Sequence, residues 1–220
     1  MVDSLSFRSG RMNAVCFTIL CKGFRVMRTT ITDRRKEKIE RVLGHRQKDL
    51  TLVLANIHDP HNVSAIYRSC DAFGVAAVHL YYTDTPFPVL GSKTSASARK
   101  WVRTRRHASP AALREALPGH QLLVTSCSPQ ARPMEAWDFT RPTAIVMGNE
   151  HKGPPEELNA VMDGEVYIPM YGMIQSFNVS VAAAILLAEA SRQRKAAGMY
   201  DRPSFPPDEY EALLNEWLHK

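Results

Sequence analysis

Short apolar runs recur along the middle of this chain, and most are followed by a helical pattern. The runs predict buried strands at 50–55, 75–82, 121–126, 143–147 and 166–168. Apolar spacing, capping residues and prolines predict helices at 34–43, 63–73, 111–117, 156–162, 180–197 and 208–219. Strands that alternate with helices in this way are typical of an α/β domain with a mostly parallel sheet.

Charge is distributed unevenly along the 220 residues, whose formal net charge is +6. Residues 1–50 hold 12 basic and 5 acidic side chains, residues 51–107 hold 7 and 3, and residues 108–220 hold 9 and 14. A basic first half indicates a polyanionic partner on that side. Solvated helix faces would give the same count, so both interpretations stay open on charge alone.

The cysteines argue against a disulfide-rich or zinc-binding protein, and the apolar runs argue against a membrane protein. Cys16, Cys21, Cys70 and Cys127 are spaced neither as a disulfide framework nor as a zinc site, so reduced thiols in a cytoplasmic protein are the simplest interpretation. No apolar stretch approaches the roughly 20 residues of a membrane helix. The apolar residues 14–21 lack a small-residue cleavage site. We therefore favour an upstream start codon, with the working protein beginning near Met27, over a signal peptide.

Three polar clusters each follow a predicted strand. The first lies within 56–68 and contains Asn56, His58, His61, Asn62 and Arg68. The second is GNEHKG at 148–153, and the third spans 168–180 and ends in QSFNVS. Ligands of parallel α/β sheets bind beyond the carboxyl ends of the strands, so we expect all three loops at that edge.

The first cluster has two open interpretations. Arg68 either pairs with an acid such as Asp71 or faces a phosphate. It lies about 120° around a helix from Asn62, so both side chains could border one cavity. His58 and His61 have a spacing that suits a metal ion, but no third ligand is evident nearby. Contact with solvent or RNA is therefore favoured over a metal.

The other two clusters also have plain structural alternatives. The glycines at 148 and 153 match neither GxGxxG nor GxxxxGK[ST], so they lack the fingerprint of dinucleotide or nucleotide triphosphate binding. An ordinary turn is the alternative. Ser176, Asn178 or Ser180 could simply cap the helix that follows. The whole polar string QSFNVS lies between apolar runs, however, and this favours a ligand-binding site over a helix cap alone.

Taken together, the three clusters resemble a known family. Residues 50–75, 143–153 and 166–189 are similar, in order and spacing, to the signature motifs of the SpoU-type RNA 2′-O-ribose methyltransferases of the SPOUT class. The similarity spans roughly residues 28–200 and is greatest to the tRNA (guanosine-2′-O-)-methyltransferase branch. Phe177 departs from the usual leucine but keeps an apolar side chain.

The resemblance implies a fold, a cofactor and an oligomeric state. An α/β domain at 50–197 would carry a deep trefoil knot at about 143–190, a topology that general folding rules disfavour. Around it would lie an extension at 1–27, a basic helix at 28–49, and a linker with a terminal helix at 198–220. The second and third clusters would hold S-adenosylmethionine through Thr125, Gly148, Ile168 and Phe177. The family implies a homodimer whose active site draws on both subunits.

The resemblance also implies methyl transfer to a ribose 2′-hydroxyl of tRNA, at guanosine 18 of the D-loop. The implied catalytic residues are Arg68, Asn62, Glu150, Ser176 and Asn178. Arg68 would act with an RNA phosphate to remove the hydroxyl proton, or would only stabilise the developing alkoxide. A guanidinium alone is a poor base because its pKa lies above about 12.

Basic side chains are expected to hold the RNA phosphates. The candidates are Arg34, Arg35, Lys38, Arg41, Arg46, His61, Arg192, Arg194 and Arg202. Two alternatives remain, a ribosomal RNA 2′-O-methyltransferase and a catalytically silent RNA-binding module. A nicotinamide dehydrogenase is disfavoured by the missing GxGxxG pattern, and no metal is expected.

Overall fold

The computed structural model describes residues 31–84, 86–89, 98–149 and 152–220. The extension expected at 1–27 and the expected site residue Glu150 lie outside the described residues. In this part of the chain, no helix is long and apolar enough to cross a membrane.

Among the described residues, seven parallel strands form one sheet in the order β3-β2-β1-β6-β4-β7-β5. They are β1 (Gln47–Ala55), β2 (Val75–Tyr81), β3 (Arg103–His107), β4 (Gln121–Thr125), β5 (Arg132–Pro133), β6 (Thr143–Met147) and β7 (Gly164–Tyr167). Their carboxyl ends therefore meet at one side of the sheet, here called the carboxyl edge. The expected α/β fold with a parallel sheet is confirmed. The knot at about 143–190 stays a prediction.

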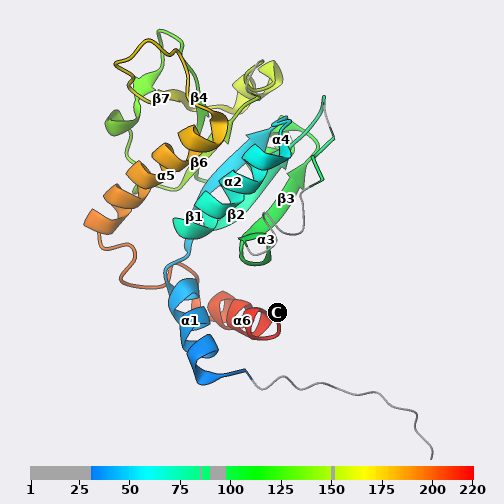
Figure 1. Ribbon diagram of the computed structural model, residues 1–220, viewed down its shortest axis with the longest axis vertical. Helices are drawn as coiled ribbons and strands as arrows, with labels where there is room; N and C mark the ends of the chain where they lie inside the picture. Colours follow the sequence, from blue (N-terminus) through cyan, green and yellow to red (C-terminus); the bar gives the residue numbers. More distant parts are fainter. Residues whose placement is uncertain (1–30, 85, 90–97, 150–151) are drawn as a thin grey trace, which may run out of the picture. The chain divides into compact units, whose positions relative to one another are not determined.

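Helices cover both faces of the sheet. They are α1 (Asp33–Gly44), α2 (Pro60–Ala72), α3 (Ala98–Trp101), α4 (Pro110–Glu115), α5 (Val179–Ala196) and α6 (Pro207–Leu218), with short 3₁₀ helices η1 (Met134–Ala136) and η2 (Glu156–Val161). Helices α2 and α5 lie side by side on one face (Figure 1). Helices α4 and η2 pack on the other face, and α1 packs on α6.

The alternation of side chains along β1 explains the two cores. Leu50, Leu52 and Leu54 point towards α2 and α5, whereas Val53 and Ala55 point towards α4 and η2. Because both faces are covered, the strand is a nearly continuous apolar run, as the sequence predicts for a buried parallel strand.

Several elements differ from the sequence prediction, among them the short α3, β5 and η1, which were not predicted. Helix α2 begins at Pro60 rather than at 63, because the Asp59 carboxylate caps it by accepting from the His61 N–H at 2.8 Å. Residues 156–161 form a 3₁₀ helix rather than the expected α-helix. Strand β3 was not predicted at all. Its sequence RTRRH has no apolar residue, and an edge strand can be this polar because only one side pairs with the sheet.

Candidate active site

Asn56 forms a corner at the carboxyl edge, directly after β1. Its φ of 52° is left-handed, a conformation that asparagine tolerates better than most residues. Its side-chain oxygen accepts hydrogen bonds from the backbone N–H groups of Thr83 (2.9 Å) and Asp84 (3.3 Å). The Asn149 side chain donates to the Asn56 carbonyl at 2.9 Å. The end of β1 is thus tied to the loops that follow β2 and β6.

The loop after β6 closes on itself. Asn149 and Gly153 form an antiparallel bridge with N–H···O distances of 3.1 and 2.9 Å. Gly148 has no room for a side chain, because a Cβ there would lie 2.3 Å from the backbone nitrogen of Pro154. The turn interpretation is therefore correct, and the turn also forms the wall of a cavity.

Asn178 joins the third polar cluster to the first. Its side-chain oxygen accepts from the N–H (2.8 Å) and the hydroxyl (2.6 Å) of Ser180, which caps the start of α5. Its side-chain N–H donates to Asn62 on α2 at 3.0 Å. The capping interpretation is correct for Asn178, and the same side chain links two of the expected catalytic residues.

A cavity of about 740 Å³, here called the cofactor cavity, opens at the ends of β4, β6 and β7 beside the start of α5. Its lining includes every residue expected to contact the cofactor, namely Thr125, Gly148, Ile168 and Phe177. Ser176 and Asn178 also line it. Apolar walls with a few polar groups suit a small organic ligand.

A second cavity of about 600 Å³ adjoins the first. It is lined by Asn56, His58, Asp59 and Asn62, and it shares the turn at Asn149, Lys152, Gly153 and Pro154 with the cofactor cavity. Two adjoining cavities at one edge can hold two reactants. No group of three His, Cys, Asp or Glu side chains within the described ranges is arranged to bind a metal.

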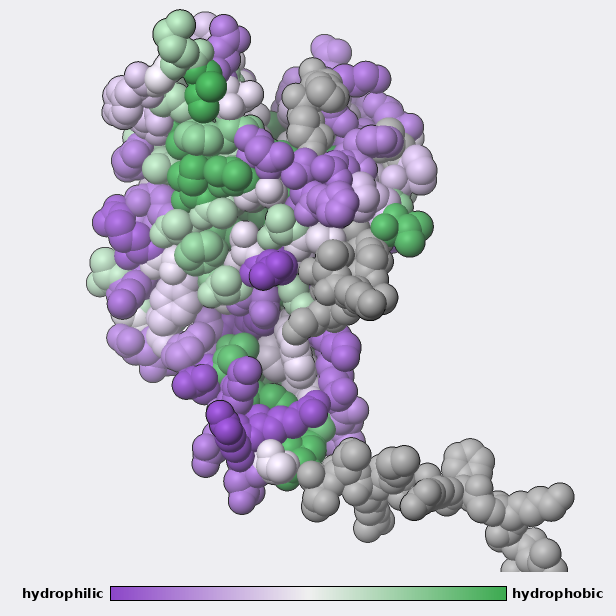
Figure 2. All heavy atoms as spheres, in the orientation of Figure 1, coloured by the Kyte–Doolittle hydropathy of each residue, from purple (hydrophilic) through white to green (hydrophobic). Residues whose placement is uncertain are grey.

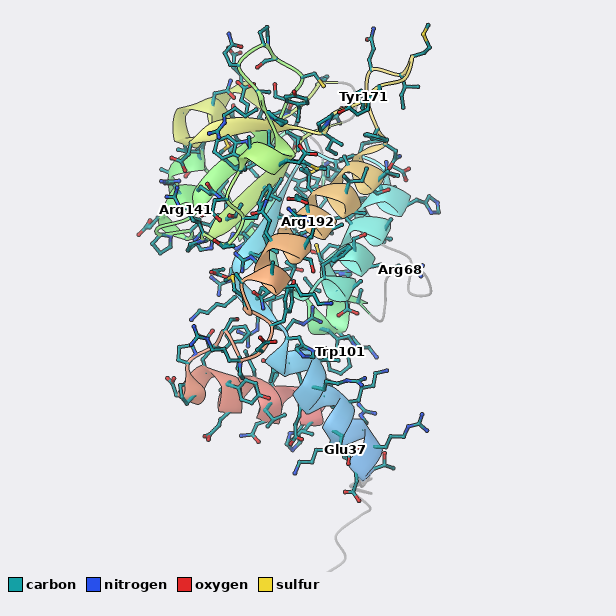
Figure 3. The ribbon with its side chains drawn as sticks, turned by 90° about the vertical axis from the view of Figure 1, so that its left-hand side faces the viewer. Glu37, Arg68, Trp101, Arg141, Tyr171 and Arg192 are labelled. Atoms are coloured by element: carbon teal, nitrogen blue, oxygen red, sulfur yellow. The ribbon has the colours of Figure 1, made fainter. Side chains whose placement is uncertain are left out.

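Arg68 lies outside both cavities of its own chain. It is exposed on α2, well removed from the loop that carries Tyr171 (Figure 3). Asp71, the acid considered as its partner, pairs instead with Arg46. Of the two open interpretations of Arg68, the ion pair with Asp71 is therefore wrong, and Asn62 and Arg68 do not border a single cavity within one chain.

Two of the expected RNA contacts are buried. Arg46 is 1% exposed and donates to the Val75 carbonyl at 2.9 Å and to the Asp71 carboxylate. Arg194 is fully buried and donates to the Phe139 carbonyl at 2.9 Å and to Asp49 at 2.5 Å. Their assignment to the RNA surface is wrong, because structural partners occupy both guanidinium groups. The other candidates are exposed: Arg34, Arg35, Lys38, Arg41, His61, Arg192 and Arg202.

Asn56 and Asn149 belong to the site, although sequence analysis selected neither as a site residue. The signal was present, since each asparagine closely follows the end of a predicted strand and lies within a recognised polar cluster.

Nearby, the Tyr81 hydroxyl donates to Glu157 at 2.6 Å, and burial together with this bond raises the pKa of Tyr81 to about 12. Tyr81 therefore stays a protonated donor at this edge.

Comparison with known proteins identifies the family. The chain matches the SpoU rRNA Methylase family over residues 49–188 and the C-terminal SpoU rRNA methylase region over 192–219. It is 45% identical over 194 residues to the tRNA (guanosine(18)-2′-O)-methyltransferase of Thermus thermophilus, covering 86% of this chain and 98% of that protein. The chain belongs to the SpoU methylase family.

Two solved structures agree with this assignment. The TrmH/SpoU tRNA modifying enzyme of A. aeolicus superposes with a TM-score of 0.77 at 37% identity, over 84% of this chain and 95% of that one. The SpoU methyltransferase AviRb from Streptomyces viridochromogenes, in complex with the cofactor AdoMet, superposes with a TM-score of 0.57 at 28% identity. That match covers 68% of this chain and 62% of AviRb.

Proposed function

We propose that this protein transfers the methyl group of S-adenosylmethionine to the 2′-hydroxyl of guanosine 18 in the D-loop of tRNA. The observation that carries the proposal is the cofactor cavity, which gathers Thr125, Gly148, Ile168 and Phe177 beside the hydrogen-bonded Asn62 and Asn178. The relative from Thermus thermophilus, covered over 98% of its length, supports guanosine 18 of tRNA over ribosomal RNA. A cytoplasmic location fits this substrate.

The cofactor cavity fits S-adenosylmethionine in size and chemistry. Its volume of about 740 Å³ lies in the usual range for small-ligand pockets. Ile168, Phe177 and Leu186 supply apolar walls, and the absence of a side chain at Gly148 lets the backbone of Gly153 and Pro154, which also line the cavity, pack close beside it. When bound, the cofactor supplies a methyl group already activated on a sulfonium. The protein has to position the ribose oxygen and help remove its proton.

The polar residues around the junction of the two cavities position the ribose. Asn62 lines the second cavity and Asn178 lines the cofactor cavity, so their 3.0 Å hydrogen bond sits at the border between the two reactants. Ser176 lines the cofactor cavity as well. Glu150, outside the described residues, completes the proposed set.

Arg68 enters this site from a second copy of the chain. Its exposed guanidinium has no hydrogen-bond or ion-pair partner among the described residues, and it lies outside both cavities of its own chain. In the complex it engages an RNA phosphate and assists deprotonation, or it stabilises the developing alkoxide. Either role requires that the two copies meet near this edge.

Exposed apolar side chains support the homodimer. They are Tyr171, Met173 and Ile174 on the loop before α5, and Val181 in its first turn, with exposed fractions of 99%, 100%, 60% and 45%. Figure 2 shows apolar surface gathered along α5 and the loops at its upper end. Contiguous apolar surface of this kind marks an interface.

The function is tested by tritiated methyl transfer to tRNA transcripts. A transcript with guanosine 18 should be labelled, and a transcript carrying adenosine at that position should not. Label in ribosomal RNA fragments instead would favour the ribosomal alternative. Binding of tRNA without any labelled product would identify a silent RNA-binding module.

The role of Arg68 is tested in the same assay. Arg68→Ala should abolish methyl transfer and leave most of the S-adenosylmethionine affinity, because Arg68 does not line the cofactor cavity of its own chain. Calorimetric titration with the cofactor provides the second measurement. Full activity of the variant would remove Arg68 from the site.

The homodimer is tested by sedimentation. Met173→Ser combined with Ile174→Ser should shift the protein towards monomer, since it removes apolar surface from the loop before α5. Val89→Ser is the matched control, because Val89 is 93% exposed but lies outside this loop. A monomeric wild type would contradict the shared site.

A further inference from the structure

A third cavity lies on the sheet face that α4 covers, away from the proposed active site. Its volume is about 680 Å³, and none of its described lining residues lines either of the other two cavities. Its described lining holds five arginine or lysine residues and two carboxylates: Arg46, Lys48, Arg103, Arg105 and Arg202, with Asp49 and Glu209. We call this cavity the basic groove.

The cations of the basic groove differ in how they are held. Arg105 and Arg202 are exposed, and within the described ranges neither has a hydrogen-bond or ion-pair partner. The side chains of Lys48 and Arg103 are 46% and 44% exposed and are oriented by Glu209 and by another carboxylate of α6. Four cations therefore remain within reach of a ligand in solvent.

The two carboxylates of the groove do not cancel this charge. Asp49 already accepts from the buried Arg194, and Glu209 is engaged by Lys48. Since each carboxylate is paired with a different cation, neither forms an ion pair with Arg105 or Arg202, and both arginines stay free to bind an anion.

Strand β3 extends the basic surface towards the carboxyl edge. Arg103 pairs with Ala77 and Arg105 with His79, so both arginines point to the groove face. His107 is paired in register with Tyr81 of β2, and Tyr81 is paired with Ala55, the last residue of β1. The strand thus leads from the groove to the side of the sheet where the proposed active site lies.

The histidines of this region carry no charge at neutral pH. His79 is buried and shares a 2.8 Å hydrogen bond with His107, and burial lowers the pKa of His79 to about 3. Burial also lowers the pKa values of His107 and His120. The positive charge of the groove therefore comes from arginine and lysine, which keep it throughout the physiological range.

Aromatic side chains lie among these cations. Trp101 and Phe205 line the groove, and the Lys48 ammonium lies 5.9 Å from the centre of the Phe205 ring. Cations interleaved with aromatic rings are typical of surfaces that bind nucleic acid. Protection of an edge strand would explain arginines on β3. It does not explain Lys48 and Arg202, which come from other parts of the chain.

We propose that the basic groove binds the phosphate backbone of tRNA at nucleotides distant from the one that is methylated. The inference rests on the proposed function for the identity of the RNA. Arginines without an acidic partner form charge-assisted hydrogen bonds with phosphate oxygens. The groove holds the body of the tRNA while the carboxyl edge carries out the chemistry.

The test is the double variant Arg105→Gln with Arg202→Gln. The KM for tRNA should rise about 10-fold, and the KM for S-adenosylmethionine should not change. Direct tRNA binding, measured by fluorescence anisotropy at several salt concentrations, should lose about two units of the slope of log K against log salt, one for each phosphate contact removed.

Arg132→Gln is the control for the loss of an exposed arginine outside the groove. Arg132 is an exposed arginine on β5, the opposite edge strand, about 29 Å from β3 at the usual strand spacing. The Arg132→Gln change removes one charge away from the groove, so the KM for tRNA should change by no more than about twofold. Because Arg105 and Arg202 are exposed, thermal melting should show the double variant folded like the wild type.

The outcomes separate the groove from the proposed function. If the double variant keeps the salt slope and tRNA affinity of Arg132→Gln, the groove does not touch RNA and the inference is overturned. If the wild type methylates no tRNA but binds it with a slope that depends on Arg105 and Arg202, the proposed function fails and the groove stands.

Discussion

The cofactor cavity and the basic groove belong to one sheet but are built in different ways. The cofactor cavity is shaped by backbone: a glycine at 148 that leaves no space for a Cβ, a bridge between Asn149 and Gly153, and the capped start of α5. The groove is shaped by charged side chains from β1, β3 and the segment before α6. In the cofactor cavity each turn is set by its own short stretch of sequence, whereas the charge of the groove depends on which side chains several distant elements direct to the same face.

The arginines show the same difference within one residue type. Arg46 and Arg194 are buried and hold the fold together, while Arg105 and Arg202 face solvent without a partner among the described residues. Residue type therefore indicates what a cation can do, and only its surroundings decide whether it binds the protein or a ligand.

Gly148→Ala should give the largest effect, and it should disturb the two cavities that share the turn while leaving the basic groove intact. The added Cβ would lie 2.3 Å from the Pro154 nitrogen, so the turn must move away. We expect no S-adenosylmethionine binding by calorimetry, while tRNA binding through the groove persists. Gly44→Ala is the control, because a Cβ there meets nothing within 4 Å. Normal cofactor binding by Gly148→Ala would show that the turn does not shape the cavity.

Arg194→Met should have the next largest effect, on stability. It leaves the Asp49 carboxylate and the Phe139 carbonyl without their donor, and losing one partner of a buried pair costs about 3 kcal/mol. The free energy of unfolding in urea gives the measurement. Lys195→Gln, the next residue on the same helix, should leave the urea midpoint unchanged, since the Lys195 side chain is exposed. Equal effects of the two changes would contradict the division between structural and surface cations.

His79 should make the groove side of the sheet sensitive to acid. The unfolded imidazole takes up a proton below about pH 6.5, whereas burial keeps the folded one neutral down to about pH 3. The unfolded state therefore binds more protons in this window, and stability falls as the pH falls, by at most about 1.4 kcal/mol per pH unit.

Urea unfolding of His79→Gln at pH 7.5 and pH 5 measures this contribution. The variant should lose less stability between the two pH values than the wild type does. The KM for S-adenosylmethionine at pH 7.5 should not change, because His79 lies outside the cofactor cavity. If the variant loses as much stability between pH 7.5 and pH 5 as the wild type does, titratable groups other than His79 cause the acid sensitivity.

Much of the fold could be predicted because the strands are buried on both faces. Such strands are continuous apolar runs, so β1 and β6 were recognised from hydropathy alone. Strand β3 was missed for the opposite reason. It lies at the edge and four of its five residues are exposed, so hydropathy carries no strand signal there.

The residues of the candidate site were predicted through the resemblance of the three clusters to a known family. Thr125, Gly148 and Ile168 meet in one cavity because parallel strands bring their carboxyl ends to one edge, and Phe177 joins them from the loop before α5. Arg194 was misassigned although its helix carried a signal. It follows Ala183, Leu187 and Ala190 along the buried stripe of α5, at a spacing of three to four residues. Arg46 follows the end of a helix and offered no such pattern.

The sequence by itself determined the α/β class and the three polar clusters, because hydropathy and turn chemistry act between near neighbours in the chain. The resemblance of these clusters to a known family supplied the four residues expected in the cofactor cavity. Only the tertiary structure decided the burial of Arg46 and Arg194, the hydrogen bond from Asn178 to Asn62 and the assembly of the basic groove. These depend on contacts between residues more than a hundred positions apart in several cases, and packing, rather than local preference, selects them.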